Sequence, residues 1–484
     1  MRRNNIFLFF SFLFFVFSFI LLFLKENNLF FKKTNFSFFI PQDLLIEDTW
    51  YGVYFQNTFI GFSHFFMKVQ DIKKGGGYLL ENKTRLNLPV LGYVEPINLH
   101  MRINLFDDYS LKEAFLNLRS ESYFLKGELK KNKNNLYSLC LETPLQKLKK
   151  PLFIKGELIN SLFFPISFNF LPLKKKVTFY VYDPFLEKKM KITLLNKGRR
   201  AMRNFKEKTY LVEMDVEGVK GKLYINPQGR LLYEEFLGFK FIKEEPRLLF
   251  SKKASSSVDI AQILAIETEK LPEPEKLHYL KVKIRGIKKE WIREDFNQKV
   301  IFQKEEAIVE ITKRIPAQET FTLSSGNFQK YLKEDRFIRF NAPLLKKTVS
   351  SIIKNEKNPL EILKKLSYWI NKNIKKVPTF SIPNTLDTLK MRQGDCAEIS
   401  ALLVGFLRCV GIPSYVNIGL VYREGKFFYH AWVSLYVGKW IDTDPALNQL
   451  IADPTHIKLF QGLENQWEIF KLLNNLKIDI VEYR

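Results

Sequence analysis

Hydrophobic and polar positions alternate along much of the first half of the chain, with a period of two. The alternation is clearest in three runs: Trp50–Phe55, Ile97–Leu105 and Lys176–Tyr182. Turn residues separate such runs at Gly75–Gly77 and Asn226–Gly229. A period of two is typical of strands with one buried face, and Gly, Pro and Asn clusters mark the turns between them. We therefore predict an antiparallel β-rich domain over residues 45–250.

Two further alternating runs, Tyr279–Ile284 and Val300–Ile311, predict a small β module within residues 277–335. After this module the spacing of the apolar residues changes to that of a helix. Asn358-Pro359 has the form of a helix start, a side-chain cap followed by proline at the first helical position. The apolar residues that follow share one helix face, and Pro378 is expected to end the helix.

The amino terminus carries an apolar run of 19 residues, Ile6–Leu24, interrupted only by Ser11 and Ser18. As a helix it would span about 28 Å, close to the ~30 Å hydrocarbon layer of a bilayer. No small-residue cleavage site follows Leu24, which favours an uncleaved transmembrane helix over a cleaved signal or a buried helix. We predict that residues 1–25 form a membrane anchor or signal sequence. The rest of the chain is then expected outside the cytoplasm, periplasmic or extracellular.

The composition is that of a folded protein, with 46% hydrophobic and 26% charged residues, which excludes extensive disorder. The net charge is +25, of which residues 341–484, with 19 basic and 13 acidic residues, carry +6. The excess is spread along the chain and no nucleic-acid-binding motif accompanies it, so we predict no nucleic-acid partner. Three cysteines, Cys140, Cys396 and Cys409, cannot form a disulfide framework, and their spacing suggests no metal. At least one thiol is therefore free.

One of these thiols lies in residues 394–411, which read GDCAEISALLVGFLRCVG. Asp395 and Glu398 have the spacing of a capping box, which places Cys396 at the first helical position. Gly411 stops the helix, and apolar residues cover nearly every face, so we predict a buried helix. Unpaired N–H groups and the dipole at a helix N-terminus lower the pKa of a cysteine. We therefore predict that Cys396 is an activated thiol.

Three strands are predicted after this helix: Tyr415–Tyr422, Phe427–Leu435 and Trp440–Asp444. The middle strand carries His430. If Tyr436–Gly438 connects the last two strands, His430 lies opposite Asp444, at a Cβ separation of about 4.5–5.5 Å. A two-residue connection would shift this register and could put Pro445 opposite His430 instead. Geometry alone therefore does not settle the partner, and Asp442 is the alternative to Asp444. His456 follows Asp453-Pro454 and could approach the site, but a surface or capping role is favoured.

The motifs GDCAE, YHAWVSLYV and GKWIDTDPA occur in this order, with 34 residues from Cys396 to His430 and 14 from His430 to Asp444. In these motifs and their spacing, roughly residues 341–470 resemble the transglutaminase-like superfamily of papain-type thiol enzymes. The resemblance implies a papain-like α+β domain over residues 341–484, in which a central cysteine-bearing helix packs on an antiparallel sheet. The overall fold class is then α+β. Ala446 and Ser434 replace the threonine and glutamate of many relatives.

The same resemblance implies roles for three residues: Cys396 as nucleophile, His430 as base and then acid, and Asp444 as the residue that orients the imidazole. The chemistry would be attack on a peptide or amide bond through a thioester. We expect a hydrolase, a cysteine peptidase or amidase, as in bacterial relatives of this architecture. A protein cross-linking acyl transferase and a non-catalytic module whose β domain binds a partner are the alternatives. We predict a peptide or protein substrate, attachment to the membrane through residues 6–24, and no cofactor or metal.

Overall fold

The structure is a computed structural model of the chain. It describes residues 23–24, 47–70, 76–90, 93–107, 110–121, 123–133, 136–144, 147–153, 158–159, 173–183, 188–254, 259–304, 306–315, 328–377, 383–473 and 475–484. Contacts divide it into two compact units, one within Leu13–Val258 and one that includes Asp259–Arg484. Both units are rich in antiparallel strands and contain few helices, which confirms the predicted α+β class.

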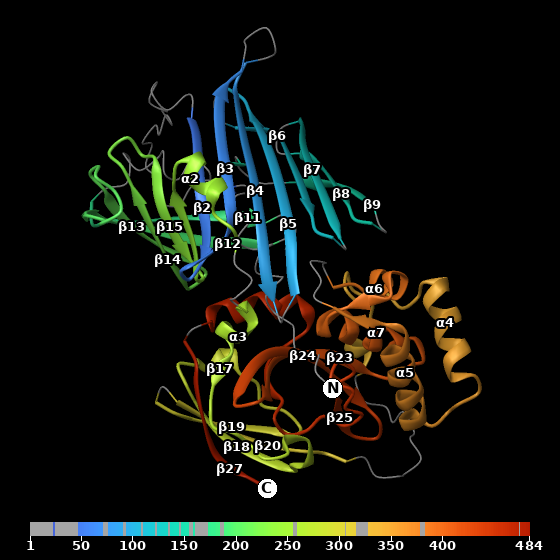
Figure 1. The fold of residues 1–484 in the computed structure, drawn as a ribbon. Helices are drawn as coiled ribbons and strands as arrows, with labels where there is room; N and C mark the ends of the chain where they lie inside the picture. Colours follow the sequence, from blue (N-terminus) through green and yellow to red (C-terminus); the bar gives the residue numbers. More distant parts are fainter. Residues whose placement is uncertain are drawn as a thin grey trace. The chain divides into compact units, whose positions relative to one another are not determined.

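The first unit is one antiparallel sheet in which each strand pairs mainly with its neighbours in sequence (Figure 1). Its strand order in the described residues is β10-β1-β11-β12-β13-β14-β15-β16-β2-β3-β4-β5-β6-β7-β8-β9. The strands are β1 (Phe23–Leu24), β2 (Glu47–Phe55), β3 (Thr58–Val69), β4 (Tyr78–Val90), β5 (Tyr93–Leu105), β6 (Leu111–Arg119), β7 (Phe124–Lys133), β8 (Leu136–Glu142), β9 (Lys147–Phe153), β10 (Leu158–Ile159), β11 (Lys176–Asp183), β12 (Lys188–Arg199), β13 (Tyr210–Val216), β14 (Val219–Ile225), β15 (Leu231–Phe236) and β16 (Phe239–Lys243). Helix α2 (Pro246–Ser251) follows the last strand.

The alternating runs of the sequence lie in these strands as predicted, in β2, β5 and β11. Residues on one face of the sheet are fully buried, among them Val53 and Ile103. The turn at Asn226–Gly229 forms as predicted, with a hydrogen bond from the Gly229 N–H to the Asn226 carbonyl. The sheet therefore follows from a period-two pattern joined by local turns.

The predicted membrane anchor, Ile6–Leu24, lies outside the described residues except at its end. Phe23 and Leu24 form strand β1, which pairs with β10 and β11. Within the part of the chain that the structure describes, no helix is long and apolar enough to cross a membrane. Membrane attachment therefore stays a prediction.

In its described residues, the second unit contains three further sheets and its own helices (Figure 1). A four-stranded sheet has the order β19-β20-β18-β27, so a strand from the C-terminus completes the small β module. The elements are α3 (Ile260–Leu264), β17 (Ile266–Glu267), β18 (Tyr279–Arg285), β19 (Gln298–Gln303), β20 (Glu306–Thr312), α4 (Pro343–Ile353), α5 (Pro359–Asn373), β21 (Lys375–Lys376), α6 (Thr385–Met391), β22 (Gln393–Gly394), α7 (Cys396–Cys409), β23 (Ser414–Arg423), β24 (Lys426–Tyr436), β25 (Trp440–Thr443), β26 (Ile457–Gln461) and β27 (Lys477–Tyr483). Four short 3-10 helices are η5 (Pro274–Lys276), η6 (Lys289–Trp291), η7 (Gln329–Tyr331) and η8 (Leu463–Lys471).

Helix α5 begins as predicted, because the Asn358 side chain accepts hydrogen bonds from the N–H groups of Leu360 and Glu361. It ends at Asn373, five residues before Pro378. The reason is that Lys375–Lys376 leaves the helix to form β21, which pairs in parallel with Gln393–Gly394 of β22. The pairing holds the chain immediately before Cys396 against the end of α5.

The sheet that carries His430 has the order β17-β24-β23-β26. Strand β25 pairs with the C-terminal part of β24. Helix α7 packs against β23 and β24. Gly419 allows β26 to approach closely, since a Cβ at this position would lie 2.0 Å from the Ile457 carbonyl oxygen and 2.7 Å from the Trp432 ring. The sheet and helix together form the buried core of this domain.

Candidate active site

Cys396 is the first residue of α7, and the capping box predicted before it is present. The Asp395 side chain accepts a hydrogen bond from the Ala397 N–H, and the Glu398 side chain accepts one from the Asp395 N–H. The helix ends at Cys409, followed by Gly411 with φ 79°. These two ends fix the cysteine at the N-terminus of a rigid, buried element.

The Cys396 sulfur lies against the strand that carries His430, because the Ala431 N–H donates a hydrogen bond to Sγ over 3.0 Å. Cys396 is only 3% exposed. Burial and the negative charge of Asp444 raise the pKa of this thiol well above its ordinary value, and the N–H groups of Ala431 and of Cys396 itself offset only part of that rise. The predicted lowering of the pKa is therefore wrong in direction, since the sequence shows the helix terminus but not the depth of burial. The thiol keeps its proton until a base takes it.

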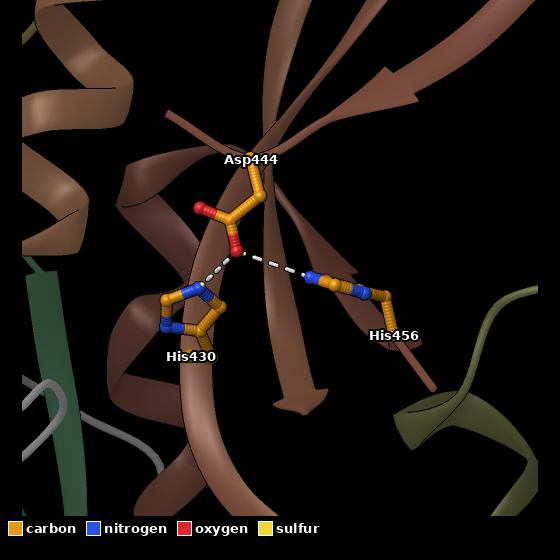
Figure 2. A group of neighbouring side chains, drawn as sticks. All are labelled: His430, Asp444 and His456. Atoms are coloured by element: carbon orange, nitrogen blue, oxygen red, sulfur yellow. Dashed lines mark hydrogen bonds and ion pairs between the residues drawn. The ribbon is translucent and has the colours of Figure 1, made fainter. Parts of the chain in front are cut away.

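His430 lies in the middle of β24 and is 2% exposed. Its Nε2 is 2.7 Å from Oδ2 of Asp444 (Figure 2). Because a carboxylate only accepts hydrogen bonds, Nε2 carries the proton of this contact. In the neutral ring Nδ1 then holds the lone pair that can accept a proton, which is the arrangement a general base needs.

The strand register differs by two residues from the prediction. The connection between β24 and β25 is Val437–Lys439, with Gly438 at φ 86°, so Tyr436 pairs with Trp440 and Ser434 with Asp442. Strand β25 ends at Thr443, and Asp444 is not a direct cross-strand partner of His430. The carboxylate reaches the imidazole along a diagonal, a distance that side chains can span.

Asp444 is fully buried, and both of its oxygens are occupied. Oδ1 accepts hydrogen bonds from the N–H groups of Ala446 and Leu447, each over 2.9 Å. Oδ2 faces both His430 and a second histidine, His456, at 3.1 Å (Figure 2). Burial alone would raise the pKa of Asp444, but the two histidines hold it well below its usual range. Asp444 is therefore ionised and fixed in place.

The surface position favoured for His456 is wrong, because this residue is 2% exposed; it lies beside Asp444, as the alternative prediction of an approach to the site requires. Its Nδ1 is 3.0 Å from the Asp453 carbonyl oxygen and 3.2 Å from the Asp453 Oδ1. Burial alone would lower the pKa of His456, but hydrogen bonds to Asp444 and Asp453 raise it to about 10. The only sequence signal for this position was its place in the segment ADPTHI, near the end of the family resemblance.

Asp442, the alternative partner of His430, is held elsewhere. It accepts hydrogen bonds from the Ser434 hydroxyl over 2.5 Å and from the Asn297 side chain over 2.9 Å. It also pairs with Lys458 Nζ at 2.8 Å. Lys458 is fully buried and reaches Asp295 at 2.7 Å as well. These contacts join the loop before β19 to the sheet that carries His430.

Replacing Lys458 by methionine is expected to lower the free energy of unfolding by about 3–5 kcal/mol, because Asp295 and Asp442 would remain buried without a cation. Urea unfolding of the full chain measures the loss. The matched control is Lys276→Met, which breaks an exposed pair with Glu273 and should change stability little. Equal losses in the two variants would contradict a buried role for Lys458.

His430, Asp444 and His456 each offer one possible ligand atom, a ring nitrogen or a carboxylate oxygen. These three atoms lie within 4.8 Å of one another, a spacing that a shared cation could also use. The hydrogen-bond pattern favours proton sharing instead. A cation on Nε2 of both rings would replace the two contacts that hold His430 and His456 to Asp444. The arrangement is thus suited to a thiol, a base and an orienting carboxylate.

Part of the chain is similar to a known family, and the chain is similar to several solved structures. Residues 346–445 match the model of the transglutaminase-like superfamily. A search of curated proteins finds no match. Three solved structures are similar in part.

A candidate cysteine protease from Cytophaga hutchinsonii is 15% identical, with a TM-score of 0.30, and the match covers 43% of this chain and 86% of that one. A β-barrel-like protein with a domain of unknown function from Brucella abortus is 9% identical, with a TM-score of 0.30, and the match covers 42% and 97%. A candidate protease from Parabacteroides distasonis is 12% identical, with a TM-score of 0.20, and the match covers 76% and 68%. Over residues 346–445 the chain thus matches the transglutaminase-like superfamily, as the motifs around Cys396, His430 and Asp444 imply.

Proposed function

We propose that the protein is a thiol hydrolase that cleaves peptide or related amide bonds through a thioester on Cys396. The observation that carries the proposal is the placement of one thiol and one oriented imidazole on adjoining elements. Sγ of Cys396 accepts a hydrogen bond from the residue next to His430, and His430 is held by Asp444 at 2.7 Å. Cysteine-type enzyme chemistry is what this pairing supports best.

In this mechanism His430 takes the thiol proton as the Cys396 sulfur attacks the carbonyl carbon of the substrate. A base is necessary, because burial raises the pKa of this thiol. The imidazolium then gives its proton to the leaving amine, and the acyl group remains on sulfur as a thioester. Asp444 keeps the ring in the tautomer with its proton on Nε2 and stabilises the positive charge that develops.

The N-terminus of α7 would supply the stabilising donors for the oxyanion. Backbone N–H groups at this end point out of the helix, and that of Cys396 lies beside the reacting sulfur. One such donor is typically worth about 3 kcal/mol of transition-state stabilisation. Water then attacks the thioester carbonyl carbon while His430 takes one of its protons; the C–S bond breaks, the carboxylic acid leaves and the proton returns to Sγ. We favour hydrolysis over transfer because hydrolysis needs no second substrate, whereas transfer needs an amine acceptor.

The proposal includes a location outside the cytoplasm, with the chain attached to the membrane through residues 6–24. Its support is the apolar run Ile6–Leu24, which is long enough to span a bilayer. Membrane fractionation of cells that make the full chain tests this part. Recovery of the chain in the soluble cytoplasmic fraction would contradict it and would leave the chemistry untouched.

The chemistry is tested with a glutamine-containing peptide, incubated with the full chain in the presence and absence of a primary amine. Mass spectrometry of the products separates the candidate reactions. Shortened peptides, or ammonia release without amine incorporation, support hydrolysis. Incorporation of the amine would support the acyl transferase instead. If a broad peptide library gives neither product, and Cys396→Ala behaves as the unmodified chain does, the non-catalytic binding module is favoured.

A further inference from the structure

Oxygen atoms face both ring nitrogens of His456. Nδ1 faces two oxygens of Asp453, and Nε2 faces Oδ2 of Asp444. None of these oxygens can donate a proton, since they belong to a carbonyl group and to two carboxylates. A neutral imidazole has one N–H. Its unprotonated nitrogen would then face an oxygen atom, and neither of the two could donate a proton to the other. A ring with protons on both nitrogens satisfies all of them.

The surrounding charges favour that doubly protonated ring. His456 lies between the carboxylates of Asp444 and Asp453, all three nearly fully buried. Asp453 is itself fixed, because its Oδ1 accepts from Thr455 and its Oδ2 from the Gln449 side chain. Burial alone would raise the pKa of Asp453, but these bonds and His456 lower it to about 2. Two buried carboxylates with one cation between them are far less costly than two without.

We propose that His456 is a positioning residue that is charged at neutral pH: an imidazolium that extends the catalytic group to Asp453, His456, Asp444 and His430 and holds the Asp444 carboxylate in place for His430. Figure 2 shows the two rings on either side of the shared Asp444 oxygen. His456 touches no substrate and transfers no proton. This inference rests on the proposed function of Asp444, although the protonation state of His456 does not.

The charge on His456 also affects His430. The other titratable groups near these four residues are the Cys396 thiol and the Lys376 amine, both of which interact with Asp444. The centroids of the His430 and His456 rings lie 6.1 Å apart. With His456 charged, part of the negative charge of Asp444 is neutralised, and Oδ2 of Asp444 stays between the two rings.

The first experiment measures the protonation state without reference to activity. The full chain is labelled with ¹⁵N only in its histidine rings, and the spectra are recorded at pH 8 in the presence of a chelator. Signals of His456 are assigned by their loss in His456→Gln. We expect both ring nitrogens of His456 to carry protons at pH 8. A single proton, or a nitrogen bound to a metal without the chelator, would overturn the proposal and leave the proposed hydrolase function standing.

The second experiment tests positioning with two neutral replacements. Glutamine can place its amide near the Nε2 position and still donate to Asp444, whereas asparagine can reach only the Nδ1 position beside Asp453. We expect His456→Asn to lower kcat by about tenfold to a hundredfold, the scale of one hydrogen bond to a charged group, with little change in KM. His456→Gln should lose less. In both, the acidic limb of the pH profile of kcat/KM should move to higher pH.

The matched control is His278→Gln, because His278 is an exposed histidine in the same unit. It should leave kcat and the pH profile unchanged. Equal kcat and identical profiles in His456→Asn and the unmodified chain would show that His456 positions nothing, even if its ring is charged.

Stability supplies a readout that remains if the asparagine variant folds poorly. Folded His456 holds its proton up to about pH 10, against 6.5 for an ordinary histidine, so the folded state binds more protons than the unfolded state between these values. The free energy of unfolding should therefore fall as pH rises above 6.5, and His456→Gln should lack this slope between pH 6.5 and 8. The same slope in both proteins would contradict the assignment.

Discussion

Replacing Cys396 by alanine is expected to lower kcat/KM by about a million-fold, the scale of losing a nucleophile that acts together with its base. Sγ is the atom that would attack the substrate, and it accepts a hydrogen bond from the Ala431 N–H. Alanine keeps the helix start and the capping box of Asp395 and Glu398. Activity should therefore be lost without a comparable loss of stability. A peptide cleavage assay and a thermal unfolding curve on the same preparation measure the two effects.

Cys409→Ala is the matched control, since Cys409 is a half-buried free thiol at the other end of the same helix. It should retain activity close to that of the unmodified chain. Residual activity above about a thousandth in Cys396→Ala would show that another group performs the attack. Loss of activity in Cys409→Ala would show that the assay reports the integrity of α7 rather than the chemistry of its first residue.

The first part of the site could be predicted because its signals are local. Asp395 and Glu398 specify a helix start within four residues, and this alone places Cys396 at the N-terminus of α7. The Asn358 cap of α5 was predictable for the same reason. Alternating strands with short turns likewise determine their neighbours in the sheet, as in β2 and β5.

Contacts that depend on the path of the chain between elements were harder to predict. The position of Asp444 relative to His430 depends on which residues form the β24–β25 connection, and the structure uses Val437–Lys439 where Tyr436–Gly438 was expected. The aspartate was still identified, because the family resemblance did not depend on the register. The early end of α5 depends on pairing with Gln393–Gly394, which no local pattern in α5 reveals.

Burial was the third feature that the sequence did not show. The helix terminus at Cys396 is a local property, but the pKa of the thiol depends on how much water the surrounding elements exclude. His456 and Lys458 are similar cases. A histidine and a lysine in a polar segment are usually exposed, yet here each is buried beside two carboxylates. His456 meets Asp444, and Lys458 meets Asp295 and Asp442, only when segments distant in sequence come together in the fold.

Replacing Asp444 by asparagine is expected to lower kcat by about ten-thousand-fold, the scale that the same exchange causes in serine-protease triads. The carboxylate accepts hydrogen bonds from both His430 and His456 on Oδ2. An amide has one oxygen and one NH₂ group. Its oxygen cannot serve the two rings and the two backbone N–H groups of Ala446 and Leu447 together. If the NH₂ group faces His430, it favours the tautomer with its proton on Nδ1, which cannot accept the thiol proton.

Asp442→Asn is the control that separates chemistry from folding. Asp442 lies two residues earlier on the same segment and is as deeply buried, but it binds Ser434, Asn297 and Lys458. This variant should lower the free energy of unfolding, because Lys458 loses one of its two carboxylate partners, while the folded fraction keeps its kcat. In Asp444→Asn, by contrast, the folded fraction itself should lose kcat. If the two variants lost kcat equally at matched folded fractions, Asp444 would be a structural residue like Asp442, and the orienting role assigned to it would be wrong.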